Sequence, residues 1–349
     1  MDLRRLFFSV LWERMEMYRR VGMKDRAEED MRYFHECAVE SKESDLVSWG
    51  SIVLSNIMYL DMGRMAEAEK HLRKAGKTLL KNPSPNLLFL FFNNMANLMS
   101  FTGRTRGALY YNKKAIEVCA EKALKKEVPM LYSNRGLTYI HMKKPEKAKE
   151  PLKRSILLAR KSNDLYTEAF ALLHLGIAQL YLGEYENALE LLHGSLEIND
   201  KIGHRTKSAM CLNAIGFAHR LMKEYQNALP FFDRASRINA EIGDKRSQVT
   251  NLTNMGLTYN EMNAWGKAES ILKKGLVLSI EIGYHLGEYE CSAGLGDAYK
   301  ALKRIPEALR AYEHTAATAK KMNLHSEYAE VAAHIEQLKN AVRKTREKV

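Results

Sequence analysis

Residues 211–244 read CLNAIGFAHRLMKEYQNALPFFDRASRINAEIGD, and close variants of this stretch recur along almost the whole chain. Its frame consists of a small residue, a ring, an aromatic side chain and two further small residues, namely Gly216, His219, Tyr225, Ala228 and Ala235. The frame returns downstream as Gly256, Tyr259, Trp265, Ala268 and Gly275 and as Gly296, Tyr299, Ala308 and Thr315, and upstream as Gly176, Tyr185, Ala188 and Ser195 and as Gly136, Tyr139, Ala148 and Ser155. Self-similarity at a constant period of this size predicts a solenoid of stacked units.

The period is set by a small residue that follows each predicted turn. This residue is Ala27, Ala68, Ala108, Ala148, Ala188, Ala228, Ala268 or Ala308, so the first interval is 41 residues and the others are 40. Apolar residues run at helical spacing on both sides of each turn, which predicts a pair of antiparallel helices per unit. The turns carry the expected residues, as in MGRM at 62–65 and LGEY at 182–185, and Pro145 begins a second helix.

Composition places the chain among ordered proteins. Of 349 residues, 46% are hydrophobic and 7 are proline, and a repeat array of this length can form one elongated domain. The apolar run from Leu6 to Trp12 is too short for a membrane span, and charged residues follow it, so we expect an amphipathic first helix. Four cysteines are scattered along the chain: Cys37, Cys119, Cys211 and Cys291. Such cysteines typically act as small buried hydrophobic residues in proteins of the reducing cytoplasm. We therefore predict a cytoplasmic protein without a membrane span.

The formal net charge of +12 is concentrated in one region. Residues 102–160 contain fifteen Lys and Arg against five Asp and Glu. Most of these cations fall on turns and second helices, among them Lys113, Lys114, Lys147, Lys153 and Arg154. Such a run is commonly a solvated face, and the alternative is a docking surface for an acidic partner, a nucleic acid backbone or a membrane surface. No alternation of basic and aromatic residues favours sequence-specific DNA binding.

The sequence has no recognisable catalytic motif. Gly76-Lys77-Thr78 lies within a predicted second helix and has His71 where a phosphate-binding loop needs its first glycine. His35 and Cys37 are two residues apart with no second pair nearby, and the sequon at 251–253 falls inside a predicted helix. We predict a protein that is not an enzyme and holds neither a cofactor nor a metal.

The frame of small and aromatic residues resembles the tetratricopeptide repeat over about residues 8–320, and the helix predicted at 324–345 resembles a capping helix. The period of 40, in place of about 34, resembles the subgroup found in kinesin light chains, Pins-type spindle adaptors, Rap-type peptide receptors and the helical sensor domain of the maltose activator. The EIGD-type ending at 241–244 is also typical of that subgroup.

The resemblance implies an all-α, right-handed superhelix of eight helix pairs in a single domain over residues 1–349. The repeats are expected at about 8–41, 49–82, 89–122, 129–162, 169–202, 209–242, 249–282 and 289–322. The first repeat departs from the frame, because Phe34 stands where a small residue is expected. We expect that its irregular end leaves self-association through the N-terminal end possible.

In the family that the chain resembles, the first helix of each pair lines the concave surface. Several asparagines recur there in register with the small residue: Asn93, Asn94, Asn97, Asn134, Asn213, Asn254 and Asn260. Asparagine is a mediocre helix former, and its amide can pair with a peptide main chain through both a donor and an acceptor. The alternative is that these amides bond to neighbouring helices or face solvent.

Other residues on these helices are expected to select the ligand. Arg220 and Lys300, helped by His174, would favour carboxylates, and Tyr181 and Phe217 would supply apolar contacts. We predict a scaffold that binds a peptide or protein segment on its concave surface. The alternatives are a sensor or regulatory module, either a peptide receptor or the helical part of a larger regulator, and, third, a nucleic-acid or membrane binder that uses the basic face.

Overall fold

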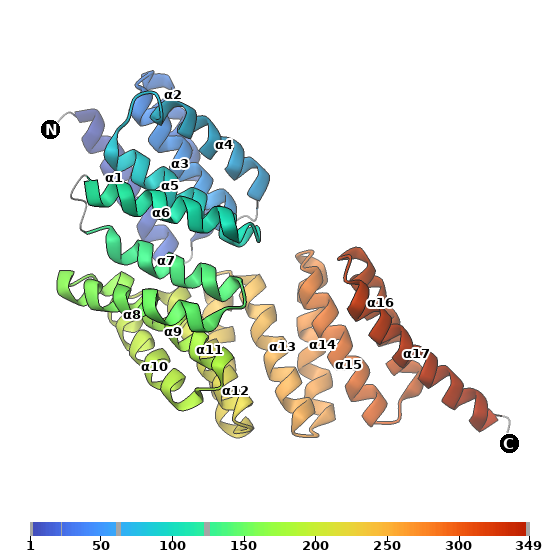
Figure 1. Ribbon diagram of the computed structural model, residues 1–349. Coiled ribbons are helices and arrows are strands. Elements are labelled where there is room, and N and C mark those ends of the chain that lie inside the picture. The colour runs from blue at the N-terminus through green and yellow to red at the C-terminus, as the bar shows by residue number, and fades with distance from the viewer. Residues whose placement is uncertain (1–2, 22, 61–63, 122–125, 347–349) are drawn as a thin grey trace. The chain divides into compact units, whose positions relative to one another are not determined.

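A computed structural model describes residues 3–21, 23–60, 64–121 and 126–346. Over these ranges the chain forms seventeen α-helices and no strand (Figure 1). The all-α solenoid predicted from the repeat period is confirmed, because consecutive helices pair and adjacent pairs stack. Contacts divide the chain into two compact units, Met1–Cys211 and Leu212–Val349, which we call unit 1 and unit 2.

Unit 1 consists of five helix pairs and the start of α11. The pairs are α1 (Leu3–Val21) with α2 (Lys24–Ser41), α3 (Ser44–Leu60) with α4 (Met65–Leu79), α5 (Pro85–Phe101) with α6 (Thr105–Glu121), α7 (Val128–His141) with α8 (Pro145–Ser162), and α9 (Leu165–Leu182) with α10 (Tyr185–Lys201). Residues 61–63 of the predicted MGRM turn, and residues 122–125 of the basic region, lie outside the described residues.

Unit 2 contains the rest of α11 (Arg205–Leu221) and six further helices. These are α12 (Tyr225–Glu241), α13 (Lys245–Glu261), α14 (Trp265–Glu281), α15 (His285–Ala301), α16 (Ile305–Lys321) and α17 (His325–Arg346). The last helix packs against α16, where the sequence predicted a terminal helix over 324–345.

Most first helices begin about one turn earlier than the expected repeat boundaries. α9 begins at Leu165 rather than 169, and α13 begins at Lys245 rather than 249. For α9 and α13 the residue before the helix is a capping aspartate. The Asp164 carboxylate accepts from the Thr167 backbone N–H at 3.0 Å, and Asp244 accepts from Ser247 at 3.1 Å. A side-chain cap of this kind satisfies an unpaired N–H at the start of a helix and extends it.

The small residues of the frame lie where paired helices approach most closely. The eight alanines that follow the turns are at most 1% exposed. A Cβ atom on Gly136 would lie 2.4 Å from Leu152 Cγ, and one on Gly216 would lie 2.8 Å from a ring carbon of Phe232. The missing side chain therefore lets a large apolar residue of the second helix fill the contact, as the sequence predicted.

The first pair uses aromatic residues in place of this arrangement. Phe34 is 1% exposed and packs edge-to-face on Phe8 at 4.8 Å and on Trp49 at 4.9 Å, measured between ring centroids. Its ring fills the space that a small residue leaves for a partner in the later repeats. The departure from the frame is therefore accommodated by a different core, with the same pairing of helices.

Helix α9 is the one described helix that is long and apolar enough to cross a membrane, and 61% of that span is buried within the structure. It lies between α8 and α10, with which it makes extensive contacts. Its apolar composition is explained by packing on both sides.

The first helices of adjacent pairs contact one another within each unit. α3 contacts α5, α5 contacts α7, α7 contacts α9, and in unit 2 α13 contacts α15. The second helices α4, α6, α8 and α10 make no comparable contact with one another among the described residues. Each unit thus has a continuous surface made by its first helices, the first-helix face, and an opposite second-helix face.

Candidate functional site

Two rows of side chains cross the first-helix face of unit 1. The first row consists of Asn97 on α5, Leu137 on α7 and Ile177 on α9, each directly after the small residue of its helix, and all three are half-buried. The Asn97 side chain forms no hydrogen bond with another described residue. This row therefore offers one free amide beside two apolar side chains.

The second row lies one helical turn further along and consists of Phe101, His141 and Tyr181. Phe101 is 46% exposed and Tyr181 is 67% exposed. The Phe101 and His141 rings lie 5.7 Å apart, and His141 Nδ1 lies 2.8 Å from Ser100 Oγ. Desolvation by its neighbours lowers the pKa of His141, so the ring is neutral at pH 7. Sequence reasoning found Tyr181 but missed the other two, which occupy the same register five residues after the small residue.

The remaining asparagines of unit 1 are partly engaged. Asn134 is 6% exposed, and its Nδ2 donates to Asn93 Oδ1 at 2.8 Å, which links α5 to α7. The Asn93 amide nitrogen is left for another partner, because this bond uses only its oxygen. Asn94 is 3% exposed and donates to the Leu90 carbonyl at 2.9 Å. Of these three, Asn93 is the residue whose amide is available on the surface.

His174 is a structural residue of α9. It is 4% exposed, and its Nδ1 lies 2.7 Å from the Phe170 carbonyl one turn earlier. Burial, with a smaller contribution from the Lys207 ammonium, lowers the pKa of His174 to about 3. The expectation that His174 would help to attract carboxylates is not met, since the ring carries no charge near neutral pH.

The first-helix face of unit 2 carries a different set of bonds. Asn213 Nδ2 donates to Asn251 Oδ1 at 2.5 Å, linking α11 to α13. Asn260 is 8% exposed and donates to the Gly294 carbonyl at 2.8 Å, linking α13 to α15. Asn254 is half-buried, and its amide has no partner among the described residues. Here too one asparagine offers a free amide while its neighbours tie helices together.

Charge on this face of unit 2 is partly compensated. The Arg220 guanidinium donates to both carboxylate oxygens of Glu261, with a shortest distance of 2.6 Å. Burial raises the pKa of Glu290, and the same guanidinium opposes that shift. Phe217 is half-buried and Lys300 is exposed. Arg220 is therefore not a free cation, and the sequence analysis missed Glu261 and Glu290, the carboxylates that share its surface.

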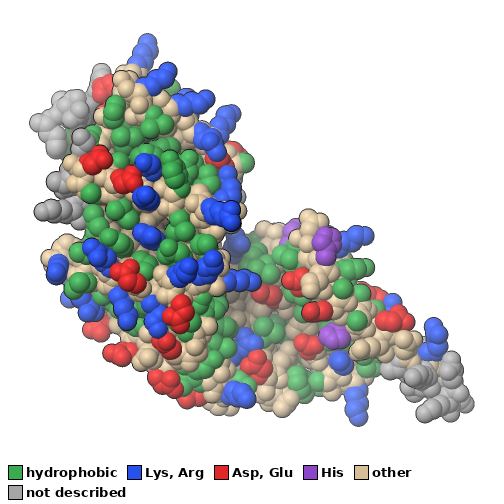
Figure 2. All heavy atoms as spheres, in the orientation of Figure 1, with side chains coloured by type: hydrophobic (Ala, Val, Ile, Leu, Met, Phe, Trp, Pro, Cys, Tyr) green, Lys and Arg blue, Asp and Glu red, His purple; other side chains and the backbone are tan. Residues whose placement is uncertain are grey.

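The basic residues singled out from the sequence lie on the second-helix face of unit 1. Figure 2 shows Lys and Arg side chains gathered over α6 and α8. Lys114 and, more weakly, Lys113 pair with Glu117, and the Arg154 guanidinium lies 5.0 Å from the centre of the Tyr132 ring. Lys147 and Lys153 are exposed, and within the described part of the chain neither has a carboxylate partner. Local acidic residues therefore leave much of this positive charge uncompensated.

The first helix carries an apolar face toward solvent. Leu6, Phe7, Val10 and Met17 on α1 are 41%, 42%, 59% and 52% exposed. Self-association through this end of the chain stays a prediction.

The described residues offer no cluster of metal ligands and no activated thiol. No group of three or more His, Cys, Asp or Glu side chains within residues 3–21, 23–60, 64–121 and 126–346 is placed to hold a metal ion. The four cysteines are free, and burial raises the pKa of Cys119, Cys211 and Cys291 to about 11 in each case. These thiols stay protonated at neutral pH and are poor nucleophiles.

Comparison with known families agrees with the geometry. Residues 131–162, 170–197 and 207–278 match models of the tetratricopeptide repeat. The chain therefore contains tetratricopeptide repeats, as the sequence frame indicated. No curated protein matches the chain significantly.

Several solved structures share the fold at low sequence identity. A Rap protein complexed with competence and sporulation factor is 15% identical with a TM-score of 0.64, and the match covers 97% of this chain and 98% of that one. NprR in complex with its cognate peptide NprX is 16% identical with a TM-score of 0.58, over 98% and 99% of the two chains. A signal transduction ATPase with a tetratricopeptide repeat sensor from Pyrococcus horikoshii is 17% identical with a TM-score of 0.65; the match covers 95% of this chain but 50% of that protein.

Proposed function

We propose that this protein binds a peptide or an extended protein segment on its first-helix face and that it acts as a scaffold or as the sensor part of a regulatory system. The observation that carries the proposal is the pair of rows in unit 1, where the free amide of Asn97 lies beside Leu137 and one turn from exposed Phe101 and Tyr181. An amide can pair with any peptide main chain, and the apolar and aromatic side chains then select ligand residues.

The similar structures support this choice of ligand. Among them, a Rap protein is complexed with competence and sporulation factor, and NprR is in complex with its cognate peptide NprX. The fold is shared over nearly the full length of each chain, so a peptide is a reasonable first ligand class to test. The same fold also occurs as the sensor part of a larger ATPase, which supports the regulatory alternative. The chemistry of the described residues supports binding without catalysis. The four free cysteines support a location inside the cell, where thiols stay reduced.

The test is selection of peptides from a random display library against the full chain, followed by affinity measurement. Asn97→Ala combined with Tyr181→Ala should weaken binding of the selected peptides by at least about tenfold, because it removes an amide pair and an aromatic contact worth about 1.4 kcal/mol or more together. The matched control is Asn187→Ala combined with Tyr110→Ala, since both residues are exposed on second helices. Peptides that bind both double variants equally well would contradict the proposal.

A second interaction is supported by the uncompensated charge on α6 and α8. We infer that this face docks an acidic protein segment, because Lys147 and Lys153 lack carboxylate partners among the described residues. Binding of a poly-glutamate peptide should fall steeply with added salt and vanish on Lys147→Glu with Lys153→Glu. Binding of a DNA duplex in preference to that peptide would favour a nucleic acid instead.

A further inference from the structure

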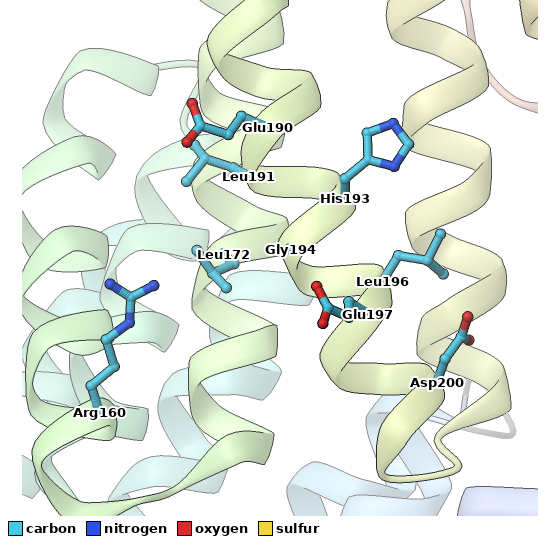
Figure 3. A pocket seen from close by; sticks show the side chains of 9 residues that line it. All are labelled: Arg160, Leu172, Glu190, Leu191, His193, Gly194, Leu196, Glu197 and Asp200. Atoms are coloured by element: carbon cyan, nitrogen blue, oxygen red, sulfur yellow. The ribbon is translucent and has the colours of Figure 1, made fainter.

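The second-helix face of unit 1 contains a pocket between α8 and α10, over α9. It has a volume of about 600 Å³. Its residues are Arg160, Leu172, Glu190, Leu191, His193, Gly194, Leu196, Glu197 and Asp200 (Figure 3). Leucine side chains supply its apolar part, and the Glu190 and Glu197 carboxylates stand on either side of Gly194 (Figure 3).

The pocket exists because a side chain is missing at residue 194. The first repeat has Tyr33 at the equivalent position, and every other repeat carries a long or ring-bearing basic residue there, namely Lys74, Lys114, Arg154, Arg234, Lys274 and His314. In the preceding repeat Arg154 extends over the Tyr132 ring at 5.0 Å. Forty residues later, Gly194 and Leu172 stand at the positions equivalent to Arg154 and Tyr132. Residue 194 therefore places no cation over the Leu172 side chain at the base of the pocket. The neighbouring repeat therefore shows what kind of group fits this space.

Packing does not require glycine here. A Cβ on Gly194 would have Leu172 Cδ1 as its nearest neighbour, at 3.9 Å, which is ordinary contact. By contrast, a Cβ on Gly176 would collide with Leu192 Cγ at 2.8 Å. Glycine inside a helix costs about 0.5–1 kcal/mol relative to alanine. Gly194 thus weakens α10 without relieving a clash, and its structural consequence is the open pocket.

The charges around the pocket favour a cation. Glu190 and Glu197 lie four residues before and three residues after Gly194, which puts all three on one side of α10. Neither carboxylate has a hydrogen bond or ion pair with another described residue. The one guanidinium in the lining, on Arg160, is bound to Glu168 at 2.6 Å. The rim therefore presents two uncompensated carboxylates.

We propose that this pocket receives an arginine side chain from a partner protein. The planar guanidinium would lie over Leu172, as Arg154 lies over Tyr132, and would donate to Glu190 and Glu197. Arginine fits better than lysine, because its guanidinium combines a flat, weakly hydrated surface with donors in a fork that matches carboxylates. The pocket lies on the opposite face from the proposed peptide site, so the two proposals stand or fall separately.

The test uses the full chain with labelled leucine methyl groups and the probe acetyl-Gly-Arg-Gly-amide, followed by NMR. Saturable shifts are expected at the methyl groups of Leu172, Leu191 and Leu196, with a Kd on the order of 1 mM for this single-side-chain probe. Glu190→Gln with Glu197→Gln should weaken binding at least tenfold, since the carboxylates are lost. Glu186→Gln, an exposed site on the same helix outside the pocket, is the matched control.

Gly194→Arg provides a second variant that keeps the protein folded. Its own guanidinium would reach Glu190 and Glu197 and fill the pocket, so binding should vanish while thermal stability is kept or raised. Equal shifts with the citrulline or lysine analogue of the probe, or shifts that persist in Gly194→Arg, would overturn the proposal. Concentration-dependent shifts of the same methyl groups without any probe would assign the pocket to a second copy of this chain instead.

Discussion

The first-helix faces of the two units use the same register for opposite chemistry. In unit 1, Ser100 on α5 contacts His141 on α7 through a hydrogen bond of 2.8 Å. In unit 2, the equivalent residues are Arg220 on α11 and Glu261 on α13, which form an ion pair at 2.6 Å. Unit 1 adds exposed aromatic rings to this row. In unit 2 a half-buried carboxylate from another register, Glu290, lies close enough to Arg220 for the guanidinium to lower its pKa.

The difference shows how a repeat protein diversifies a surface. The residues that pack the helices are alike in both units, because the two helices of every pair contact each other in the same way. The residues beside them face neighbouring repeats or solvent, where many side chains fit. Unit 1 is therefore suited to neutral, apolar ligand groups, and unit 2 to charged ones.

The largest expected effect is a difference between the two units in how their stability depends on pH. Four histidines with lowered pKa lie in unit 1: His35, His71, His141 and His174. An unfolded histidine has a pKa of about 6.5, so below that pH the unfolded state binds more protons and stability falls. For the buried His174, with a folded pKa of about 3, the loss approaches about 1.4 kcal/mol per pH unit well below pH 6.5 and amounts to about 1.6 kcal/mol between pH 6.5 and pH 5. Hydrogen exchange at these two pH values, corrected for intrinsic rates, should show unit 1 losing protection.

His174→Asn is the control for this prediction. Asn94 already makes the same bond to a carbonyl four residues earlier, at 2.9 Å, that His174 makes at 2.7 Å. The variant keeps the bond but removes the titrating ring, so the pH dependence of unit 1 should become shallower even if overall stability falls. An unchanged pH dependence would show that His174 is not its source.

The second prediction tests whether the two units really share their packing. A Cβ on Gly136 in unit 1 and one on Gly256 in unit 2 would each lie 2.4 Å from a leucine Cγ, those of Leu152 and Leu272. Gly136→Ala and Gly256→Ala should each destabilise their unit by about 1–3 kcal/mol through overpacking. Urea unfolding followed by hydrogen exchange measures both. Costs that differ by more than about 1 kcal/mol would mean that the units are packed differently.

The third prediction concerns the equivalent contacts themselves. A double-mutant cycle of Arg220→Ala and Glu261→Ala should give a coupling of about 1 kcal/mol, reduced by high salt, because both side chains are partly exposed. The Ser100→Ala and His141→Ala cycle is the matched comparison, and its coupling should not depend on salt since the pair is neutral. Similar salt dependence in both cycles would contradict the electrostatic difference between the first-helix faces of the two units.

The smallest expected effect comes from the second-helix face. Gly194→Ala should stabilise unit 1 by about 0.5–1 kcal/mol, because alanine lowers the conformational entropy of the unfolded chain and its Cβ fits without a clash. Thermal melting of the variant measures this change. The result contrasts directly with the loss expected for Gly136→Ala, and destabilisation by Gly194→Ala would show that packing at Gly194 is tighter than the distances indicate.

The helix pairs and their contact residues could be predicted from sequence because they depend on local pattern. Gly136, Gly216 and Gly256 stand at fixed intervals, and a fixed interval in a helical chain puts each at the same contact. The helix starts were less predictable, since the roles of Asp164 and Asp244 depend on cap geometry. Phe34 shows the same limit, because its partners Phe8 and Trp49 come from two other helices.

The sequence by itself determined the repeat period, the all-α class and the face on which Asn97, Asn254 and their equivalents lie. The tertiary structure alone decided which polar groups remain available, because that depends on neighbours about forty residues away. It paired Asn134 with Asn93, tied Arg220 to Glu261 and buried His174 as a neutral ring. It also opened the pocket at Gly194, since an absent side chain matters only where packing leaves its space unfilled.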